Sequence, residues 1–166
     1  NMAYTYWKDG IHNRRSVFDL YFRKLPFENG YAVFAGLEKI VEYIENFSFT
    51  ESDIAYLAEL QFEEEFLQYL QIMKFTGTIR SMQEGEVVFN NEPFLRVDAP
   101  LGEAQIIETA LLNIVNYQTL IATKAARMKH AANNDELLEF GTRRAHEFDA
   151  ALWGTRAAFI GGFSST

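Results

Sequence analysis

The chain of 166 residues contains no cysteine, three prolines and two tryptophans. The absence of cysteine excludes a disulfide scaffold, a zinc ribbon and a cysteine nucleophile. No apolar run approaches the roughly 18 residues that a membrane span requires, and no basic segment followed by an apolar one opens the chain. We therefore expect a soluble, cytoplasmic protein with no membrane partner.

The composition is that of one ordinary globular domain. Hydrophobic residues make up 48% and charged residues 23% of the chain, which excludes a disordered tail and a fibrous repeat. A chain of this length buries roughly two-thirds of the surface that its unfolded form exposes. It therefore needs neither a disulfide nor a metal ion to hold its core together.

Negative charge is concentrated in one stretch. Between Glu38 and Glu65, nine acidic residues stand against Lys39 alone, so this stretch carries the whole formal net charge of −8. With a sequence pI near 4.9, a broad surface for a phosphate backbone is not expected, and we expect no nucleic-acid partner. The acidic residues are interpreted as the solvated faces of helices.

Residue patterns predict helices and short strands through most of the chain. Phe18, Leu20 and Phe22 alternate with polar residues, as in a strand, and Thr50 with Asp53 is typical of a helix N-cap. Helices are expected at residues 3–10, 31–47, 51–60, 63–73 and 101–132, and strands at 17–23, 75–81, 86–89 and 94–97.

The last thirty residues predict one βαβ unit, with a strand at 137–140, a helix at 143–153 and a strand at 157–160. The carboxyl ends of its parallel strands would share one rim, which is where α/β folds bind ligands. No helix follows to cover this unit, although a parallel sheet needs both faces covered. We therefore expect the chain to be part of a longer protein.

That rim carries the residues best suited to bind an anion. The guanidinium forks of Arg143 and Arg144 bind carboxylates and phosphates through two parallel hydrogen bonds. Adjacent arginines at a helix start oppose the helix dipole, which favours an anionic ligand there. The structural alternative is a salt bridge to an acidic neighbour: Glu139, Glu147 or Asp149.

Other residues near the rim are weaker signals. Phe140 and Phe163 are placed to sandwich a flat ring, although single phenylalanines more often belong to a core. Gly161 and Gly162, followed by hydroxyl side chains, can present backbone N–H groups to a phosphate. His146 and Asp149 share a helix face that suits a general base, but no nucleophile or third partner accompanies them. No Walker loop, GxGxxG or HExxH motif is present.

Seven segments, in order along the whole chain, resemble the bacterial type of nicotinate phosphoribosyltransferase. They are NMAYTYWKDG (1–10), AVFAGLE (32–38), EGEVVFNNEP (84–93), ETALLNIVNYQTLIATKAAR (108–127), LEFGTRRA (138–145), WGTRAA (153–158) and GGFSST (161–166). The pairing of LEFGTRRA with GGFSST at this separation is the most specific part of the resemblance.

The resemblance implies an enzyme of NAD salvage biosynthesis. The family joins nicotinate to phosphoribosyl pyrophosphate, giving nicotinate mononucleotide and pyrophosphate, with coupled ATP hydrolysis and Mg²⁺. Its members have an α/β N-terminal domain that leads into an irregular β/α barrel, and they form homodimers with active sites near the subunit boundary. On this mapping, residues 1–134 form the N-terminal domain and residues 135–166 form the incomplete start of the barrel.

The resemblance also assigns substrate-binding residues. Phe140 matches the aromatic residue that stacks on the pyridine ring, and Arg143 matches the arginine that faces the phosphoribosyl and carboxylate groups, with Arg144 beside it. Ser164 and Ser165 lie where the nicotinamide-using relatives place an aspartate. A hydroxyl there avoids opposing two carboxylates, which fits an acid substrate. The expected substrate-binding set is Phe140, Arg143, Arg144, Gly162, Ser164 and Ser165.

Two parts of the family's site fall outside this sequence. The ring-stacking tyrosine precedes Asn1, and the phosphorylated histidine and the magnesium and phosphate loops follow Thr166. His12, His130 and His146 do not match that histidine. We therefore expect no catalytic residue and no metal ligand in this chain, and no activity from it alone. Two alternatives remain at this point: a non-catalytic α/β assembly module, and a relative that uses nicotinamide or quinolinate.

Overall fold

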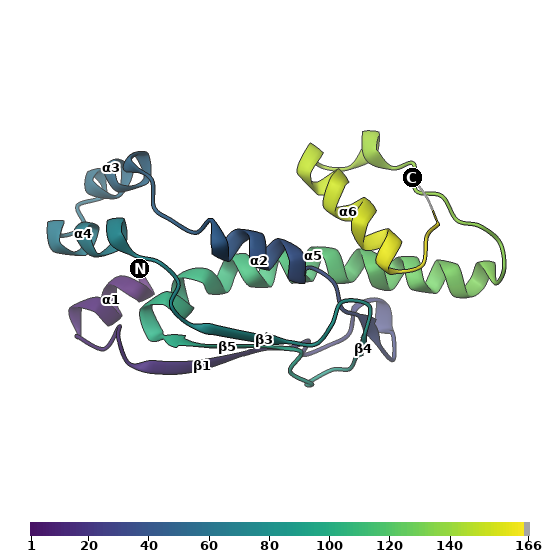
Figure 1. Ribbon diagram of the computed structural model, residues 1–166, viewed down its shortest axis with the longest axis horizontal. Coiled ribbons are helices and arrows are strands. Elements are labelled where there is room, and N and C mark those ends of the chain that lie inside the picture. Colours follow the sequence, from purple (N-terminus) through teal and green to yellow (C-terminus); the bar gives the residue numbers. More distant parts are fainter. Residues whose placement is uncertain (165–166) are drawn as a thin grey trace. The chain divides into compact units, whose positions relative to one another are not determined.

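The computed structural model describes residues 1–164, apart from the side chain of Pro26, as a mixture of helices and short strands (Figure 1). The mixture confirms the predicted α/β class. The elements in chain order are α1 (Met2–Lys8), β1 (Arg15–Leu20), the 3₁₀ helix η1 (Pro26–Glu28), β2 (Ala32–Val33), α2 (Leu37–Glu45), α3 (Glu51–Glu59), α4 (Glu64–Ile72), β3 (Thr78–Ser81), β4 (Val87–Val88), β5 (Leu95–Pro100), α5 (Leu101–Ala132), the 3₁₀ helix η2 (Thr142–Arg144) and α6 (Phe148–Ile160).

The strands form two small sheets. One has three strands in the order β1-β5-β3, and the other pairs β2 with β4 in antiparallel register, with Ala32 opposite Val88 and Val33 opposite Val87. No helix of the described residues combines the length and the apolar character that crossing a membrane requires.

The chain divides into two compact units. The first contains residues 1–18, 41–80 and 96–109, and the second contains residues 19–40, 81–95 and the described chain from residue 110 onward. The division predicted at residues 134 and 135 stays a prediction. Every candidate binding residue that the structure describes belongs to the second unit.

The core of the first unit is aromatic. Phe66, Leu70 and Met73 of the α4 region are buried, and rings pack around them, with the Tyr4 ring 5.0 Å from those of both Phe62 and Phe66. At the start of α3, the Thr50 hydroxyl accepts from the Asp53 N–H at 3.2 Å, while the Thr50 N–H donates to the Asp53 carboxylate at 2.8 Å. This reciprocal capping confirms the helix start predicted from the sequence. The acidic residues of α3 and α4 are exposed, as expected.

The second unit is built on residues 110–132 of α5, a helix whose bounds match the predicted helix. The hydroxyls of Thr119 and Thr123 are buried. They form hydrogen bonds with the backbone of β2 and of the residues that follow it, as a neighbouring strand would. The Val33 N–H donates to Thr123 Oγ1 at 3.0 Å, and the Ala35 N–H donates to Thr119 Oγ1 at 3.2 Å. Side chains of the helix thereby satisfy backbone donors that would otherwise be buried without partners.

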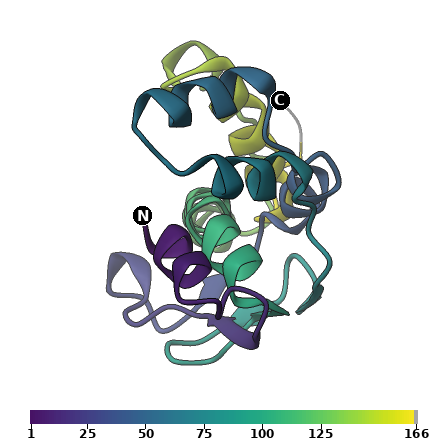
Figure 2. The same cartoon turned by 90° about the vertical axis from the view of Figure 1, so that its left-hand side faces the viewer.

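The predicted strand at 157–160 is wrong, because these residues continue α6. The buried residues of α6 are Ala151, Gly154, Ala157 and Ala158, which recur at helical spacing and pack across the C-terminal half of α5 (Figures 1 and 2). The strand predicted at 137–140 is reduced to an isolated bridge at Leu138. The described residues therefore contain no βαβ unit.

Two predicted helices also begin later than expected. The helix predicted at 31–47 starts as strand β2, and α2 begins only at Leu37, after Gly36 takes a positive φ of 115°. The helix predicted at 143–153 is replaced by η2 and α6, which begins at Phe148. Arg143 and Arg144 thus lie in a 3₁₀ turn and not in the first turn of an α-helix.

Replacing Thr123 by valine should destabilise the second unit. Valine keeps the shape of the side chain but leaves the buried Val33 N–H without an acceptor, which costs about 2 kcal/mol of unfolding free energy. Urea unfolding measures this loss, and amide exchange at Val33 should become faster. Thr123→Ser keeps the hydroxyl, so its Val33 amide should stay protected. Equal exchange at Val33 in both variants would contradict this account.

Candidate functional site

The candidate binding residues lie in two segments that flank α6. One segment runs from Leu137 through η2, and the other follows the end of α6. The Ser164 N–H donates to the Leu137 carbonyl at 2.9 Å, so the second segment returns beside the start of the first. The structure thus brings together the two segments that the sequence pattern placed on one rim, although no parallel strand pair holds them.

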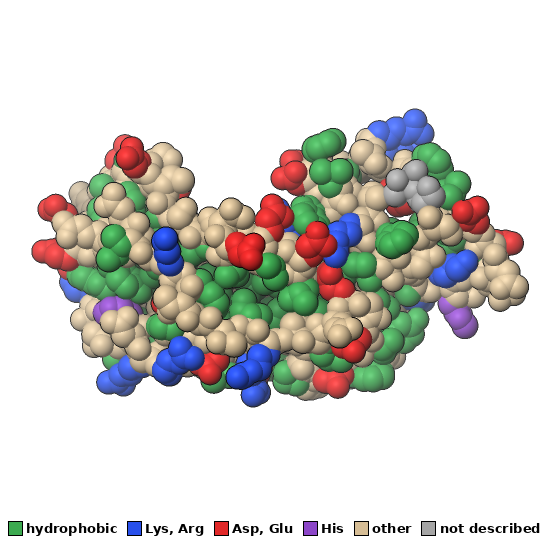
Figure 3. All heavy atoms as spheres, in the orientation of Figure 1, with side chains coloured by type: hydrophobic (Ala, Val, Ile, Leu, Met, Phe, Trp, Pro, Cys, Tyr) green, Lys and Arg blue, Asp and Glu red, His purple; other side chains and the backbone are tan. Residues whose placement is uncertain are grey.

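Arg143 and Arg144 are exposed on the η2 turn, at the end of the first segment. The turn is closed by backbone hydrogen bonds, with the Arg144 N–H donating to the Gly141 carbonyl at 2.7 Å. Figure 3 shows basic side chains gathered over the segment that precedes α6. Within residues 1–164, neither guanidinium forms an ion pair, so the expected salt-bridge alternative is not formed. Both guanidiniums remain available to an anion.

Glu139 contacts Gly141 and Thr155 in place of an arginine. Its Oε1 accepts the N–H of Gly141, and its Oε2 accepts the hydroxyl of Thr155 at 2.9 Å. Glu147 and Asp149, the other acidic residues considered as salt-bridge partners, are exposed. None of these three acidic residues therefore pairs with Arg143 or Arg144.

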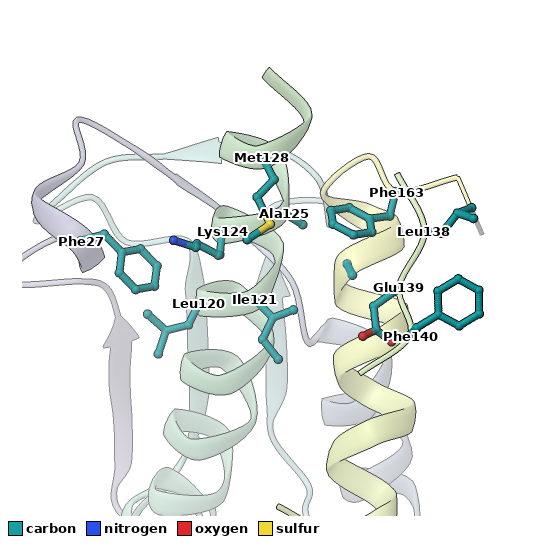
Figure 4. Close-up of a pocket in the computed structure, with 11 residues that line it drawn as sticks. Phe27, Leu120, Ile121, Lys124, Ala125, Met128, Leu138, Glu139, Phe140 and Phe163 are labelled. Carbon is teal, nitrogen blue, oxygen red and sulfur yellow. The ribbon is translucent and has the colours of Figure 1, made fainter. Parts of the chain in front are cut away.

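The two phenylalanines do not form a sandwich. Phe140 is 72% exposed and its ring points outward, whereas the ring of Phe163 points the other way, toward α5 (Figure 4). The expectation that the pair encloses one flat ring is therefore not met. Phe140 alone presents an open ring face to a ligand.

An apolar groove lies next to these residues. Its volume is about 400 Å³, and its lining includes Phe27, Leu120, Ile121, Met128, Leu138 and Phe163 (Figure 4). Lys124 and Glu139 supply its charged groups, and Lys124 Nζ lies 5.7 Å from the centre of the Phe27 ring.

A smaller and more polar hollow of about 230 Å³ is bordered by Thr142, Arg144 and Thr155. Glu139 contributes to its lining as well as to that of the groove. An apolar groove beside a polar hollow with a guanidinium suits a ligand that has a flat ring and anionic groups.

The glycine pair after α6 ends the helix. The Gly161 N–H donates to the Ala157 carbonyl at 3.0 Å and the Gly162 N–H to the Phe159 carbonyl at 2.9 Å, so both N–H groups are engaged and do not face a phosphate. Gly162 has a φ of 103°, which favours glycine. Ser164 is exposed, whereas Ser165 lies outside the described residues.

Histidines form no catalytic or metal cluster in the described chain. His146 and Asp149 are both exposed, and no hydrogen bond joins them within residues 1–164. These residues also contain no group of three or more histidine, aspartate or glutamate side chains that could hold a metal ion.

An ion pair that sequence reasoning missed anchors α6. Arg156 donates to both oxygens of Glu84, at 2.9 and 2.7 Å, and also pairs with Glu38. Glu84 Oε1 accepts the N–H groups of Gly36 and Leu37 at 2.6 and 3.0 Å, which caps the start of α2. Glu84 and Arg156 both lie in segments that resemble the family, but no rule of sequence spacing predicts a pair between positions so far apart.

The surroundings of Glu84 shift its pKa downward. Burial by itself raises the pKa of this carboxyl, but hydrogen bonds from Arg156 and from the Gly36 and Leu37 N–H groups, together with the guanidinium charge, bring the pKa below its ordinary value of 4.5. The ionised form of Glu84 is therefore the form that the folded chain stabilises.

Tyr117 packs against α6 from the side of α5. Its hydroxyl donates to the Ala150 carbonyl at 2.6 Å, and a Cβ at Gly154 would come within 2.9 Å of that oxygen. Burial and the nearby charge of Glu139 raise the pKa of Tyr117, so its hydroxyl remains a hydrogen-bond donor at neutral pH.

Comparison with known proteins identifies the family. A profile of the nicotinate phosphoribosyltransferase (NAPRTase) N-terminal domain matches residues 1–116. The chain belongs to the nicotinate phosphoribosyltransferase family. It is 68% identical to the nicotinate phosphoribosyltransferase of Bacillus subtilis, over 100% of this chain and 34% of that protein. It is 45% identical to the nicotinate phosphoribosyltransferase of Caenorhabditis elegans, over 99% of this chain and 30% of that protein.

Solved structures share the fold, and one of them belongs to this family. Human nicotinic acid phosphoribosyltransferase matches with a TM-score of 0.92 and 35% identity, over 99% of this chain and 34% of that one. A nicotinate-nucleotide pyrophosphorylase from Pyrococcus furiosus shares the fold, with a TM-score of 0.73 and 23% identity, over 98% of this chain and 34% of that one. The chain thus spans about a third of the length of its nicotinate phosphoribosyltransferase relatives.

Glu84→Gln should lower stability in a pH-dependent way. The folded pKa of Glu84 is lowered, so its stabilising effect is full above the ordinary value of 4.5 and is lost as the pH falls through that value toward the folded pKa. We expect a loss of about 2 kcal/mol at neutral pH. Urea unfolding across acidic pH should show the wild type and the variant converging. Glu45→Gln, at an exposed carboxyl of α2, is the control, and a constant difference at all pH values would contradict the assignment.

Proposed function

We propose that the longer protein containing this chain is a nicotinate phosphoribosyltransferase. It joins nicotinate to phosphoribosyl pyrophosphate, with coupled ATP hydrolysis, and releases nicotinate mononucleotide and pyrophosphate for NAD salvage. The observation that carries the proposal is the 68% identity to the Bacillus subtilis enzyme across this whole chain. The non-catalytic module is not favoured, because the likeness includes the segments that form the candidate site.

The candidate site suits two anionic substrates. Nicotinate carries a carboxylate, and phosphoribosyl pyrophosphate carries phosphates, so both need cationic hydrogen-bond donors. Arg143 and Arg144 supply guanidiniums that form no ion pair with any other described residue. The exposed Phe140 supplies a ring face on which the pyridine ring stacks. Ligand binding would cover this ring, which gives its exposure a function.

In the proposed reaction, the protein mainly positions the two substrates and does not need a nucleophilic side chain. Pyrophosphate leaves C1 of the ribose as the pyridine nitrogen forms its bond to the same carbon, so positive charge develops on the sugar and negative charge on the leaving group. Holding the two substrates in line and stabilising these charges accounts for the rate enhancement. Arg143 orients an anionic group, and Phe140 sets the plane of the ring.

Mg²⁺ and ATP belong to the proposed reaction. Residues 1–164 contain no cluster of three or more metal-ligating side chains. As the resemblance implies, we propose that the binding of Mg²⁺ and ATP, and the phosphorylated histidine, belong to other parts of the longer protein. We also propose a cytoplasmic homodimer, as the resemblance implies.

Ser164 supports the choice of the acid over the amide. The resemblance places it where nicotinamide-using relatives have an aspartate that accepts from the amide group. An aspartate facing nicotinate would set two carboxylates against each other at a cost of several kcal/mol. The hydroxyl of Ser164 imposes no such repulsion, and the same reasoning extends to Ser165.

The full-length protein should form mononucleotide from nicotinate but not from nicotinamide. Both are supplied in parallel with phosphoribosyl pyrophosphate, Mg²⁺ and ATP, and the product is quantified by chromatography. Product from nicotinamide would keep the family and overturn the role given to Ser164. A folded full-length protein that forms no product from either would overturn the proposed function.

Arg143→Ala should weaken substrate binding. Losing a charged hydrogen-bond donor is expected to raise KM for nicotinate or phosphoribosyl pyrophosphate by between about 10- and 100-fold. Arg143→Lys should recover only part of the loss, because an ammonium cannot form the two parallel bonds of a guanidinium. Arg23→Ala, which removes an exposed arginine elsewhere in the second unit, is the matched control. Unchanged KM values for Arg143→Ala would remove Arg143 from the site.

A further inference from the structure

We propose that Glu139 is a positioning residue for the binding site, because its carboxylate ties the backbone that carries Phe140 and Arg143 to helix α6. This inference rests on the proposed function. Glu139 acts through Gly141 and Thr155 and does not itself take part in the reaction.

The two oxygens of Glu139 hold different parts of the chain. Oε1 accepts the N–H of Gly141, within the same segment, and Oε2 accepts the hydroxyl of Thr155 on α6 at 2.9 Å. In the described chain, the Thr155 bond is the one polar link between residues 138–141 and α6. Apart from the bridge at Leu138, this stretch has no regular structure of its own.

The fit between Glu139 and Gly141 is close. A Cβ at Gly141 would lie 2.5 Å from Glu139 Oε1, so a side chain there would force the carboxylate to shift from its present position. Gly141 is the N-cap of η2, and its carbonyl accepts the N–H of Arg144. Fixing Gly141 therefore fixes the start of the turn that presents both arginines.

The other end of the link is anchored. Thr155 precedes Arg156, whose guanidinium is bound to both oxygens of Glu84. This ion pair and the packing on α5 hold α6 in place. The hydrogen bond to Thr155 therefore fixes the position of the binding segment relative to α6. Glu139 also borders both the apolar groove and the polar hollow, so a shift of its carboxylate would alter both.

Glutamine separates this role from a role for the negative charge. The amide oxygen of Glu139→Gln can accept the Gly141 N–H, while its NH₂ donates to the Thr155 hydroxyl, which can reverse and accept. Both links survive without the charge. A carboxylate that served as a base, or that contacted a substrate through its charge, would fail in this variant.

The test measures KM and kcat of the full-length enzyme for nicotinate and phosphoribosyl pyrophosphate. Glu139→Ala and Thr155→Val should each raise KM by about 10-fold or more, with a smaller change in kcat and an unchanged unfolding midpoint. Glu139→Gln and Thr155→Ser should stay within about threefold of the wild type, because they keep the links. The Glu139→Ala/Thr155→Val double variant should be no worse than Glu139→Ala alone. Glu136→Ala, at an exposed acidic residue just before this segment, should leave KM unchanged.

Hydrogen exchange provides a readout that does not depend on activity. Amides of residues 138–145 should exchange faster in Glu139→Ala and Thr155→Val, but not in Glu139→Gln. If Glu139→Ala fails to fold, Thr155→Val and Glu139→Gln still decide the matter.

Three results would overturn the proposal. They are a Glu139→Gln enzyme as impaired as Glu139→Ala, a Thr155→Val enzyme with wild-type KM, and unchanged exchange in Thr155→Val. A wild-type enzyme that forms no product while the exchange pattern holds would instead place the failure in the proposed function.

Discussion

The second unit depends on how closely α6 approaches α5. A Cβ at Gly161 would overlap the carbonyl oxygen of Ala122, so this position has no room for a side chain, and a Cβ at Gly154 would press on the Tyr117 hydroxyl. Ala157 and Ala122 are both buried at the contact. Small residues thus let two helix backbones meet where larger side chains would hold them apart.

This approach also sets the polar contacts of the site. With α6 in place, Tyr117 reaches the Ala150 carbonyl, Thr155 meets Glu139, and Arg156 meets Glu84. Each contact pairs a group on α6 with a group from another part of the second unit. Together they satisfy the half-buried polar atoms that the close packing would otherwise leave without partners.

The sequence predicted the regular parts of the fold because local rules govern them. The bounds of α5 and the Thr50–Asp53 capping pair follow from spacing and from N-cap chemistry within a few residues. Residues 157–160 were misassigned because a short run of alanine, phenylalanine and isoleucine fits a strand as well as a buried helix face. What decides the helix is the contact with α5, which lies more than thirty residues away in sequence.

The candidate site, like the fold, could be predicted from the sequence only in part. The sequence predicts which types of residue the site contains. It does not predict that the Phe140 ring points outward, or that the N–H groups of Gly161 and Gly162 form hydrogen bonds within the end of α6. The position of Glu139 in the sequence predicts a salt bridge to the arginines, which the structure does not form. Its hydrogen bonds to Gly141 and Thr155 depend on the position of α6, which no local sequence pattern predicts.

The pairing of two glutamates with other groups explains how a chain with a net charge of −8 can present the anion site proposed above. Glu84 is neutralised by Arg156, and Glu139 is engaged by the Gly141 N–H and the Thr155 hydroxyl, so neither is free to pair with the exposed arginines. Arg143 and Arg144 lie on a 3₁₀ turn, so their attraction for an anion comes from the guanidinium groups and not from the dipole of a long helix. Selectivity for a planar carboxylate or a phosphate would then depend on the two-pronged geometry of arginine, which depends in turn on how firmly the turn is held. Glu139 therefore serves the arginines best when it binds the backbone of the turn that carries them.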